Sequence, residues 1–240
     1  MLKKLNKMQY LYNMKTIKIN KQQHNRLFEA RMDGFRLDFL TQATSYKQRV
    51  NYCKKMLGSP IGSGSSRLVF QLDDETCLKL AKNEKGVAQN MEEISVARDN
   101  FVSFIPKIYN GSDEENGLWI VTQCVVPAKV EDFQKVLNMD FGDVANFTMA
   151  MDGSFNYRMP QFHRNSCDRF IRNVYIKYED NDEAVELLNA IHELKCSYSQ
   201  QVSDLSRIQN WGLAQENGQP CMVMLDAALT EEIWMRHYRR

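Results

Sequence analysis

The chain has 240 residues, of which 43% are hydrophobic and 25% are charged, and its formal net charge is +1. This length is sufficient to bury a core, either as one two-lobed domain or as two small ones. The balance of 31 basic against 30 acidic side chains gives no general reason to expect nucleic-acid or membrane binding. The composition therefore predicts a globular protein that binds neither a nucleic acid nor a membrane.

The basic residues nevertheless crowd both ends of the sequence, with six lysines between positions 3 and 21 and three arginines after position 235. We interpret these clusters as solvated termini, and a phosphate-rich or acidic partner is the alternative.

Six cysteines are scattered along the chain, with no C-x-x-C pair and no Cys/His cluster. Several lie within apolar strand patterns, where free cysteine behaves as a small hydrophobe. The sequence also has no apolar run of membrane-spanning length and no uninterrupted apolar segment near its first residues. These features predict unpaired thiols, a reducing compartment and a cytoplasmic location.

The first 56 residues show apolar side chains at helical spacing, most clearly from Tyr46 to Met56. They precede any strand-like pattern and are predicted to form a helical N-terminal extension. We favour packing against the following sheet as its role. Docking of a substrate, or placement of the helix that carries Glu93, is the alternative.

A possible phosphate site follows between Leu57 and Glu93. Gly62, Ser63 and Gly64 form a loop whose backbone N–H groups can approach phosphates, because glycine tolerates positive φ and has no side chain. Lys79 lies within the apolar run Cys77–Ala81, which predicts a buried strand. A buried lysine needs a phosphate or a carboxylate as partner, and Glu93 can supply the carboxylate. The alternative is a flexible Gly/Ser hairpin with no ligand.

The middle of the chain contains one strand pattern and two helix patterns. Leu118–Pro127 reads as an apolar strand that ends at a proline. Asp132–Asn138 predicts a short helix, and Asp182–Gln200 predicts a long amphipathic helix, on which His192 is expected to be a packing residue. Between these helices, Asn146–Asp168 has no clear period.

The last informative segment runs from Asp204 to Leu229. Asn210 follows Asp204 after six positions, Asn217-Gly218 predicts a turn, and Cys221–Leu225 predicts a strand that leads directly to Asp226. An aspartate at the end of an apolar strand is costly to place without a partner. Carboxylate and amide oxygens are ligands that magnesium accepts.

Together these segments resemble the protein-kinase family. In that family a G-x-G-x-x-G-x-V loop, a strand-borne lysine and a helix-borne glutamate precede a hinge, a catalytic loop and a metal-binding aspartate. Gly62 and Gly64 occupy the first two glycine positions, Arg67 stands at the third, and Val69 matches the valine. The resemblance covers about residues 57 to 229. It is strongest to small phage and bacterial kinase-like proteins that have an N-W-G turn and a shortened D-x-G.

The resemblance implies an α+β fold with a five-stranded antiparallel N-lobe (57–126) and a reduced, mostly helical C-lobe (127–240). The helical extension (1–56) precedes both lobes in the sequence. It implies ATP and Mg²⁺ as cofactors and a protein as substrate or partner, in the host cytosol if the protein is phage-encoded. Lys79, Glu93 and Asp204 are the implied catalytic residues, and Asn210 and Asp226 the implied metal ligands. The implied nucleotide-binding residues are Gly62, Ser63, Gly64, Ser65, Arg67, Val69, Lys79, Cys124 and Val126.

Several positions depart from the kinase pattern. Val202 and Ser203 stand where the histidine and arginine of H-R-D belong, and the step from Asp204 to Asn210 is one residue longer than in the family. Phe162-His163-Arg164-Asn165 resembles H-R-D more closely, but it lies too far before Asp226 and is predicted to be a polar surface or loop.

The sequence ends 14 residues after Asp226, which leaves no activation segment, A-P-E motif or later C-lobe helices to be expected. The leading hypothesis is therefore an ATP- and magnesium-dependent phosphotransferase that acts on Ser or Thr of a protein. A pseudokinase that binds nucleotide or serves as a scaffold is the alternative, and a kinase fold acting on a small molecule is a third.

Overall fold

The computed structural model describes residues 34–98, 103–112, 116–152, 164–216, 218–225 and 229–239. The chain divides into two compact units, residues 1–35 and 36–240. Almost all of the first unit, and with it most of the predicted N-terminal extension, lies outside the described residues. Within the described part of the chain, no helix is both long enough and apolar enough to cross a membrane.

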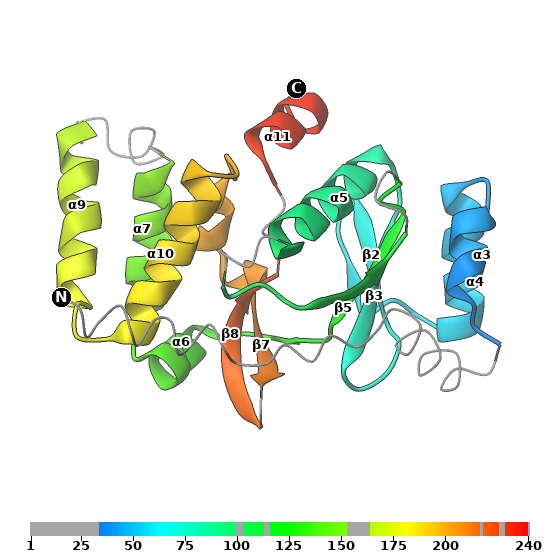
Figure 1. Ribbon diagram of the computed structural model, residues 1–240, viewed down its shortest axis with the longest axis horizontal. Coiled ribbons are helices and arrows are strands. Elements are labelled where there is room, and N and C mark those ends of the chain that lie inside the picture. The colour runs from blue at the N-terminus through cyan, green and yellow to red at the C-terminus, as the bar shows by residue number, and fades with distance from the viewer. Residues whose placement is uncertain are drawn as a thin grey trace. The chain divides into compact units, whose positions relative to one another are not determined.

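A five-stranded antiparallel sheet forms the first half of the larger unit, and it confirms the predicted mixed α+β class with such a sheet (Figure 1). Its strand order is β1-β2-β3-β5-β4. All residues of β3 and β5 are buried, because these two strands lie inside the sheet and both of its faces are covered. The strands span Gly62–Ser63 (β1), Arg67–Gln71 (β2), Thr76–Ala81 (β3), Ile108–Gly111 (β4) and Trp119–Gln123 (β5).

Helices cover the two faces of this sheet. Figure 1 shows α5 (Glu84–Arg98) on one side and the pair α3 (Leu37–Gln42) and α4 (Tyr46–Leu57) on the other. The helix α4 begins at Ser45, whose hydroxyl accepts the N–H of Gln48 at 3.3 Å. Buried Arg49 ties α4 to α3, because its guanidinium donates to the carbonyl oxygens of Leu40 and Ala43.

The predicted strand Leu118–Pro127 is divided between two sheets. β5 ends at Gln123, and Val126–Pro127 forms a separate strand, β6, in a three-stranded sheet of order β6-β7-β8. Here β7 (Trp211–Glu216) and β8 (Gln219–Met224) form a hairpin, and Gly218 in its turn has φ 78°. Leu118–Pro127 therefore leaves the first sheet and joins the second.

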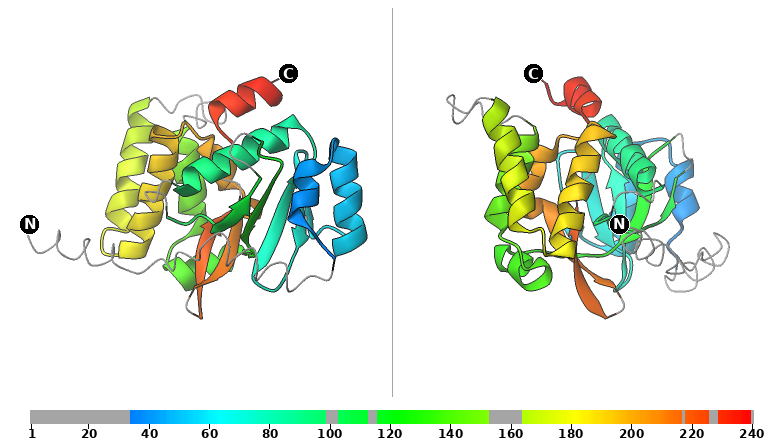
Figure 2. Two further views of the ribbon diagram at one scale, coloured as in Figure 1. Left: turned by 45° about the vertical axis from the view of Figure 1, so that its right-hand side comes forward. Right: turned by 60° about the vertical axis from the view of Figure 1, so that its left-hand side comes forward.

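The second half of the larger unit is mostly helical (Figure 2). The prediction missed α7, where Met, Phe, Asn and Gly residues mask the helical period although Val144, Phe147 and Ala150 are buried at helical spacing. It also missed α9. It also expected no helix after Asp226, where α11 lies against α5. The helices are α6 (Val130–Leu137), α7 (Phe141–Met151), α9 (Arg164–Lys177), α10 (Asp182–Cys196) and α11 (Glu231–His237).

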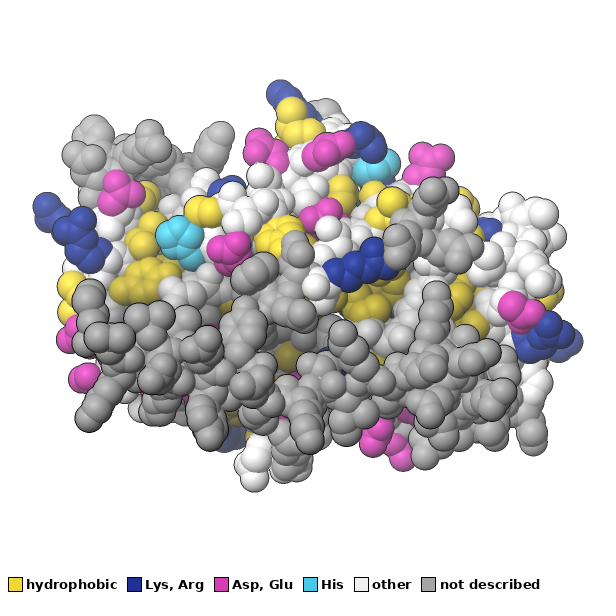
Figure 3. Space-filling view, in the orientation of Figure 1, with side chains coloured by type: hydrophobic (Ala, Val, Ile, Leu, Met, Phe, Trp, Pro, Cys, Tyr) yellow, Lys and Arg dark blue, Asp and Glu magenta, His cyan; other side chains and the backbone are white. Residues whose placement is uncertain are grey.

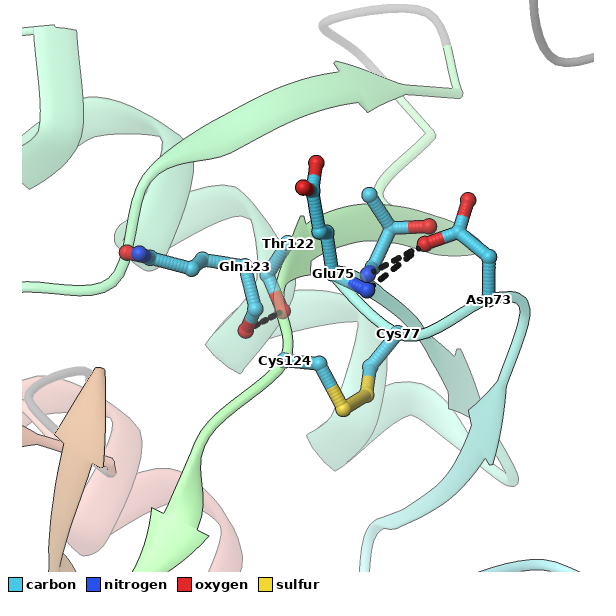
Figure 4. The surroundings of a disulfide bond; sticks show 7 residues. Asp73, Glu75, Cys77, Thr122, Gln123 and Cys124 are labelled. Carbon is cyan, nitrogen blue, oxygen red and sulfur yellow. Dashed lines mark hydrogen bonds between the residues drawn. A yellow bond between two sulfur atoms is a disulfide. The ribbon is translucent and has the colours of Figure 1, made fainter. Parts of the chain in front are cut away.

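The expectation that all cysteines are unpaired is wrong. Cys77 of β3 and Cys124, just after β5, form a disulfide with a Cα–Cα distance of 5.0 Å (Figure 4). Strand pairing brings them together, because Cys77 lies opposite Thr122, two positions before Cys124. The sequence hides this pair, since 47 positions separate the two residues. The spacing therefore gave no basis for inferring a reducing compartment.

Candidate functional site

The predicted partners Lys79 and Glu93 meet in the interior between β3 and α5. Lys79 Nζ lies 2.9 Å from Glu93 Oε1 and 2.8 Å from Oε2, so one ammonium contacts both carboxylate oxygens. Burial alone would raise the pKa of Glu93, but the charges of Arg67 and Lys79 outweigh it and hold this pKa below its usual value. Glu93 is therefore an ionised, fully enclosed carboxylate at neutral pH.

Arg67 points into the protein, where it also contacts Glu93. Its NH1 donates to Glu93 Oε1 at 2.9 Å and to Asn90 Oδ1 at 3.3 Å, and its side chain is 10% exposed. Arg67 was implied to be a nucleotide-binding residue, and its guanidinium instead contacts the helix α5. Arg67 therefore joins the end of the glycine-rich loop to the helix that carries Glu93.

The glycine-rich loop is a short hairpin that is fastened to the beginning of α5. Lys82 donates its backbone N–H to Ser66 O at 2.8 Å and its Nζ to Gly64 O. Asn83 Nδ2 donates to Ser65 O at 3.2 Å, and the Ser66 hydroxyl donates to Gln89. These bonds hold three successive carbonyl groups of the loop.

Glycine was expected in this loop because it tolerates positive φ and because it has no side chain, and the first of these reasons does not apply. Neither Gly62 nor Gly64 has positive φ. A Cβ added at Gly64 would meet nothing within 4 Å, so the absence of a side chain leaves open space beside this backbone. Ser63 lies next to it in β1 and is exposed, and Val69 lies opposite both Gly62 and Lys79. An approach to the loop backbone by a ligand remains compatible with this geometry.

Leu225 connects the lysine to the predicted catalytic loop. Its carbonyl oxygen accepts a hydrogen bond from Lys79 Nζ at 3.2 Å, and its N–H donates to the carbonyl oxygen of Asn210 at 2.8 Å. Leu225 follows β8 and directly precedes Asp226, which lies outside the described residues. Residues 146 positions apart are thus joined at the end of β8.

Asp204 lies in a short 3₁₀ segment, Val202–Ser206, and Asn210 ends a second one, Ile208–Asn210. The side-chain Nδ2 of Asn210 donates to the backbone carbonyl of Asp204 at 2.8 Å. The indole of buried Trp211 donates to Leu205 O at 2.7 Å and holds the same loop. The Asp204 carboxylate is 31% exposed and lies 3.6 Å from Arg207 NH1.

A residue that the sequence did not indicate holds the strand leading to Asp226. Phe104 has φ 63°, which is rare for a bulky side chain, and its carbonyl oxygen accepts the N–H of Met224 at 2.7 Å. No sequence signal marks this position, because neither its side chain nor its neighbours predict a left-handed backbone. Phe104 therefore fixes the end of β8 through its backbone.

The implied nucleotide-binding residues Cys124 and Val126 are partly engaged with the protein. The N–H of Cys124 donates to Glu75 O at 2.7 Å, and its sulfur belongs to the disulfide. Val126 pairs with Leu213, and its side chain is exposed, as is that of Ile61 just before Gly62. Two exposed apolar side chains therefore flank the loop and the strand β6.

Of the two predicted metal ligands, Asn210 and Asp226, only Asn210 lies among the described residues. Because Nδ2 of Asn210 is committed to Asp204 O, the amide orientation is fixed and Oδ1 is the remaining polar atom of this side chain. An amide oxygen is a ligand type that Mg²⁺ accepts. Among the described residues, no group of three or more His, Cys, Asp or Glu is arranged to hold a metal ion. His163 of the motif rejected above also lies outside the described residues.

The distribution of charged side chains on the surface does not indicate a class of partner. On the face shown in Figure 3, basic and acidic side chains are interspersed among the coloured residues. This face therefore has no broad patch of one charge within the part that the structure describes.

The sequence matches no family model, and the search of curated proteins gives no match. A search of solved structures finds the streptomycin–ATP–APH(2″)-IIa ternary complex, with a TM-score of 0.31 and 13% sequence identity. The match covers 78% of this chain and 72% of that chain. A TM-score of this size does not establish a shared fold, so the proposals below rest on the residue contacts.

Proposed function

We propose that this protein is an ATP- and magnesium-dependent phosphotransferase with a protein-kinase-like fold. The observation that carries the proposal is the bonding of Lys79 and Asn210 to the two sides of Leu225, beside Asp226. A buried lysine–glutamate pair, a fixed asparagine amide and the aspartate that follows an apolar strand are the parts that bind a metal–nucleotide complex in this class of enzyme. The bonding of Lys79 and Asn210 to the residue that precedes Asp226 in the sequence supports a nucleotide site there.

In the proposed reaction, Lys79 binds the α- and β-phosphates and Glu93 fixes the position of Lys79. The loop backbone from Gly62 to Ser65 covers the phosphates. Asn210 Oδ1 and the Asp226 carboxylate hold magnesium, which when bound neutralises phosphate charge. Asp204 orients the acceptor hydroxyl and accepts its proton.

Lys79 changes partners when the nucleotide enters. Its ammonium has three N–H donors, and within the described part of the chain two oxygens of Glu93 and one of Leu225 already lie within 3.2 Å of it. A phosphate oxygen must replace one of them. The Leu225 carbonyl is the longest and the only uncharged contact of the three, so we expect it to be displaced while Glu93 remains bound.

We propose Ser or Thr of a protein as the acceptor, because Asp204 is a partly exposed carboxylate suited to accept a hydroxyl proton. The second candidate is a pseudokinase that binds nucleotide without transfer. The contacts of Lys79 with Glu93 and Leu225 favour it, since these described residues stabilise the ammonium without any ligand.

The test is a thermal-shift titration of the full chain with ATP, with and without Mg²⁺, followed by transfer of labelled phosphate to itself and to a lysate. Lys79→Met and Asp226→Ala should each abolish the magnesium-dependent shift. Lys135→Met and Asp180→Ala, at exposed positions, should keep it. Base-labile label on protein supports Ser or Thr as acceptor.

A magnesium-dependent shift without any transfer would favour the pseudokinase. Equal shifts in the wild type, Lys79→Met and Asp226→Ala would show that ATP binds elsewhere and would remove this site from consideration.

A further inference from the structure

Two features of its position, the end of a helix and burial, disfavour a negatively charged side chain at Asp152. Asp152 is the C-terminal cap of α7, and its N–H donates to Thr148 O at 3.2 Å. The C-terminal end of a helix carries a partial negative charge, which repels a carboxylate. The Asp152 side chain is also only 4% exposed, and burial penalises its charged form. Packing alone gives no reason for an acid at this position.

Two partners stabilise this carboxylate, and both lie close to the loop that carries Asp204. Asp152 Oδ2 accepts the backbone N–H of Ser203 at 2.6 Å. Its Oδ1 lies 2.7 Å from Lys195 Nζ, in the last turn of α10, a contact with the distance of an ion pair but not the angles of a hydrogen bond. One side chain therefore connects the ends of α7 and α10 to the segment Val202–Ser206.

Ser203 is the residue immediately before Asp204. Asp152 therefore holds the backbone on one side of Asp204, and Asn210 Nδ2 holds the Asp204 carbonyl on the other side. A 3₁₀ segment has weaker internal hydrogen bonds than an α-helix, so these two bonds, together with the one from the Trp211 indole to Leu205 O, contribute to how firmly the segment is held.

We propose that Asp152 is a positioning residue that fixes the direction of the Asp204 carboxylate for phosphoryl transfer. This proposal rests on the proposed function, because it assigns Asp152 a role in the same reaction. In this role Asp152 acts through the backbone of Ser203 and not by binding the nucleotide or the acceptor. Its charge strengthens the bond to Ser203, since a hydrogen bond to an ionised acceptor is stronger than one to a neutral acceptor.

The first test measures the segment directly, by hydrogen exchange of peptides that cover residues 199–210 in the full chain. Removing a hydrogen bond to a charged group should raise exchange at Ser203 by about 10-fold to 100-fold in Asp152→Ala. Asp152→Asn retains an acceptor oxygen without the charge and should show a smaller increase. Asp143→Asn is the matched control, because Asp143 lies on the same helix and pairs with Lys177 on the surface.

The second test measures turnover of MgATP by the same four proteins, with water or protein as the acceptor. Asp152→Ala should lower kcat at least 10-fold and leave KM for ATP within about twofold, and Asp152→Asn should recover part of kcat. A purely structural defect would instead change the ATP-induced thermal shift and KM together with kcat.

Unchanged exchange at Ser203 in Asp152→Ala would overturn the proposal. Increased exchange with an unchanged kcat would also overturn it, because Asp152 would then hold the loop without serving the reaction. If the wild type does not turn over ATP, phosphoryl transfer and the role of Asp152 in it both fail. The exchange data still show separately whether Asp152 anchors the loop.

Discussion

The side-chain amide of Asn210 donates to the backbone carbonyl of Asp204 across 2.8 Å. The chain between them is one residue longer than the kinase pattern H-R-D-x-x-x-x-N. Two short 3₁₀ segments, separated at Arg207, accommodate the longer connection and still bring the two residues together. The extra residue therefore does not separate the proposed base from the proposed metal ligand.

Removing this contact should lower both turnover and stability. Asn210→Asp keeps an oxygen at the position of Oδ1 but replaces the Nδ2 donor with a second oxygen, which faces the Asp204 carbonyl. We expect kcat for phosphate transfer to fall by 10-fold or more, with a loss of unfolding free energy of about 1–3 kcal/mol. Steady-state kinetics and urea denaturation measure the two effects. A variant with unchanged kcat would argue against a role for this contact.

Arg67, Lys79 and Glu93 form a buried triad. Removing Glu93 and removing Lys79 should lower the unfolding free energy by different amounts. Glu93→Gln leaves two enclosed cations without their shared carboxylate and should cost about 3–5 kcal/mol of unfolding free energy. Lys79→Met leaves Glu93 with Arg67, which donates at 2.9 Å, and should cost less. Chemical denaturation measures both, with Glu179→Gln on an exposed turn as control. Equal losses in the two variants would contradict this order.

The same triad predicts that the unfolding free energy falls at acidic pH. The pKa of Glu93 is lower in the folded protein than in the unfolded chain, so the unfolded chain binds this proton more readily. The stabilisation from Glu93 is therefore complete above the unfolded value, about 4.3, and is lost as pH falls from there through the folded pKa. Urea denaturation between pH 7 and pH 3 should show a steeper loss for the wild type than for Glu93→Gln. Parallel curves would exclude a lowered pKa.

Gly86 allows α5 to approach the glycine-rich loop. A Cβ at this position would overlap the Ser66 carbonyl oxygen and stand 3.0 Å from the Cα of Ala81. Gly86→Ala should therefore destabilise the protein by about 1–3 kcal/mol through overpacking, although alanine is the better helix former. Gly64→Ala is the control, since its Cβ meets open space. A Gly86→Ala variant as stable as the wild type would show that the loop shifts freely away from α5.

Local patterns were sufficient to predict the elements around the lysine. The run Cys77–Ala81 became a completely buried strand, and the antiparallel sheet follows from its neighbours. The pairing of Lys79 with Glu93 follows from the rule that a buried charge requires a partner. Arg67 is different, because nothing in its neighbourhood shows whether an arginine points outward to a ligand or inward to a carboxylate.

Features that depend on contacts between distant segments could not be predicted in this way. The bond from Asp152 to Ser203 spans 51 positions, and Asp152 has no motif around it. The positive φ of Phe104 occurs where its carbonyl accepts the N–H of Met224, 120 positions away, and no residue type there demands it. The division of Leu118–Pro127 between two sheets depends on β7, which lies more than 80 positions further along the chain.

The disulfide between Cys77 and Cys124 should contribute to stability by restricting the unfolded chain. Closing a loop of 47 residues corresponds to about 4 kcal/mol in the chain-entropy model.

Peptide mapping without reductant should recover the two cysteines in one linked species. A reductant, equilibrated with the protein in urea, should lower the unfolding free energy of the wild type by up to this amount. It should have no effect on Cys77→Ser/Cys124→Ser, and Cys196→Ser, which removes an exposed free thiol, should behave as the wild type. Alkylation of both cysteines in the native, unreduced protein would show that the bond is absent. The pairing of Thr76 with Gln123 and the hydrogen bond from Cys124 N to Glu75 O would then hold this end of β5 without a covalent link.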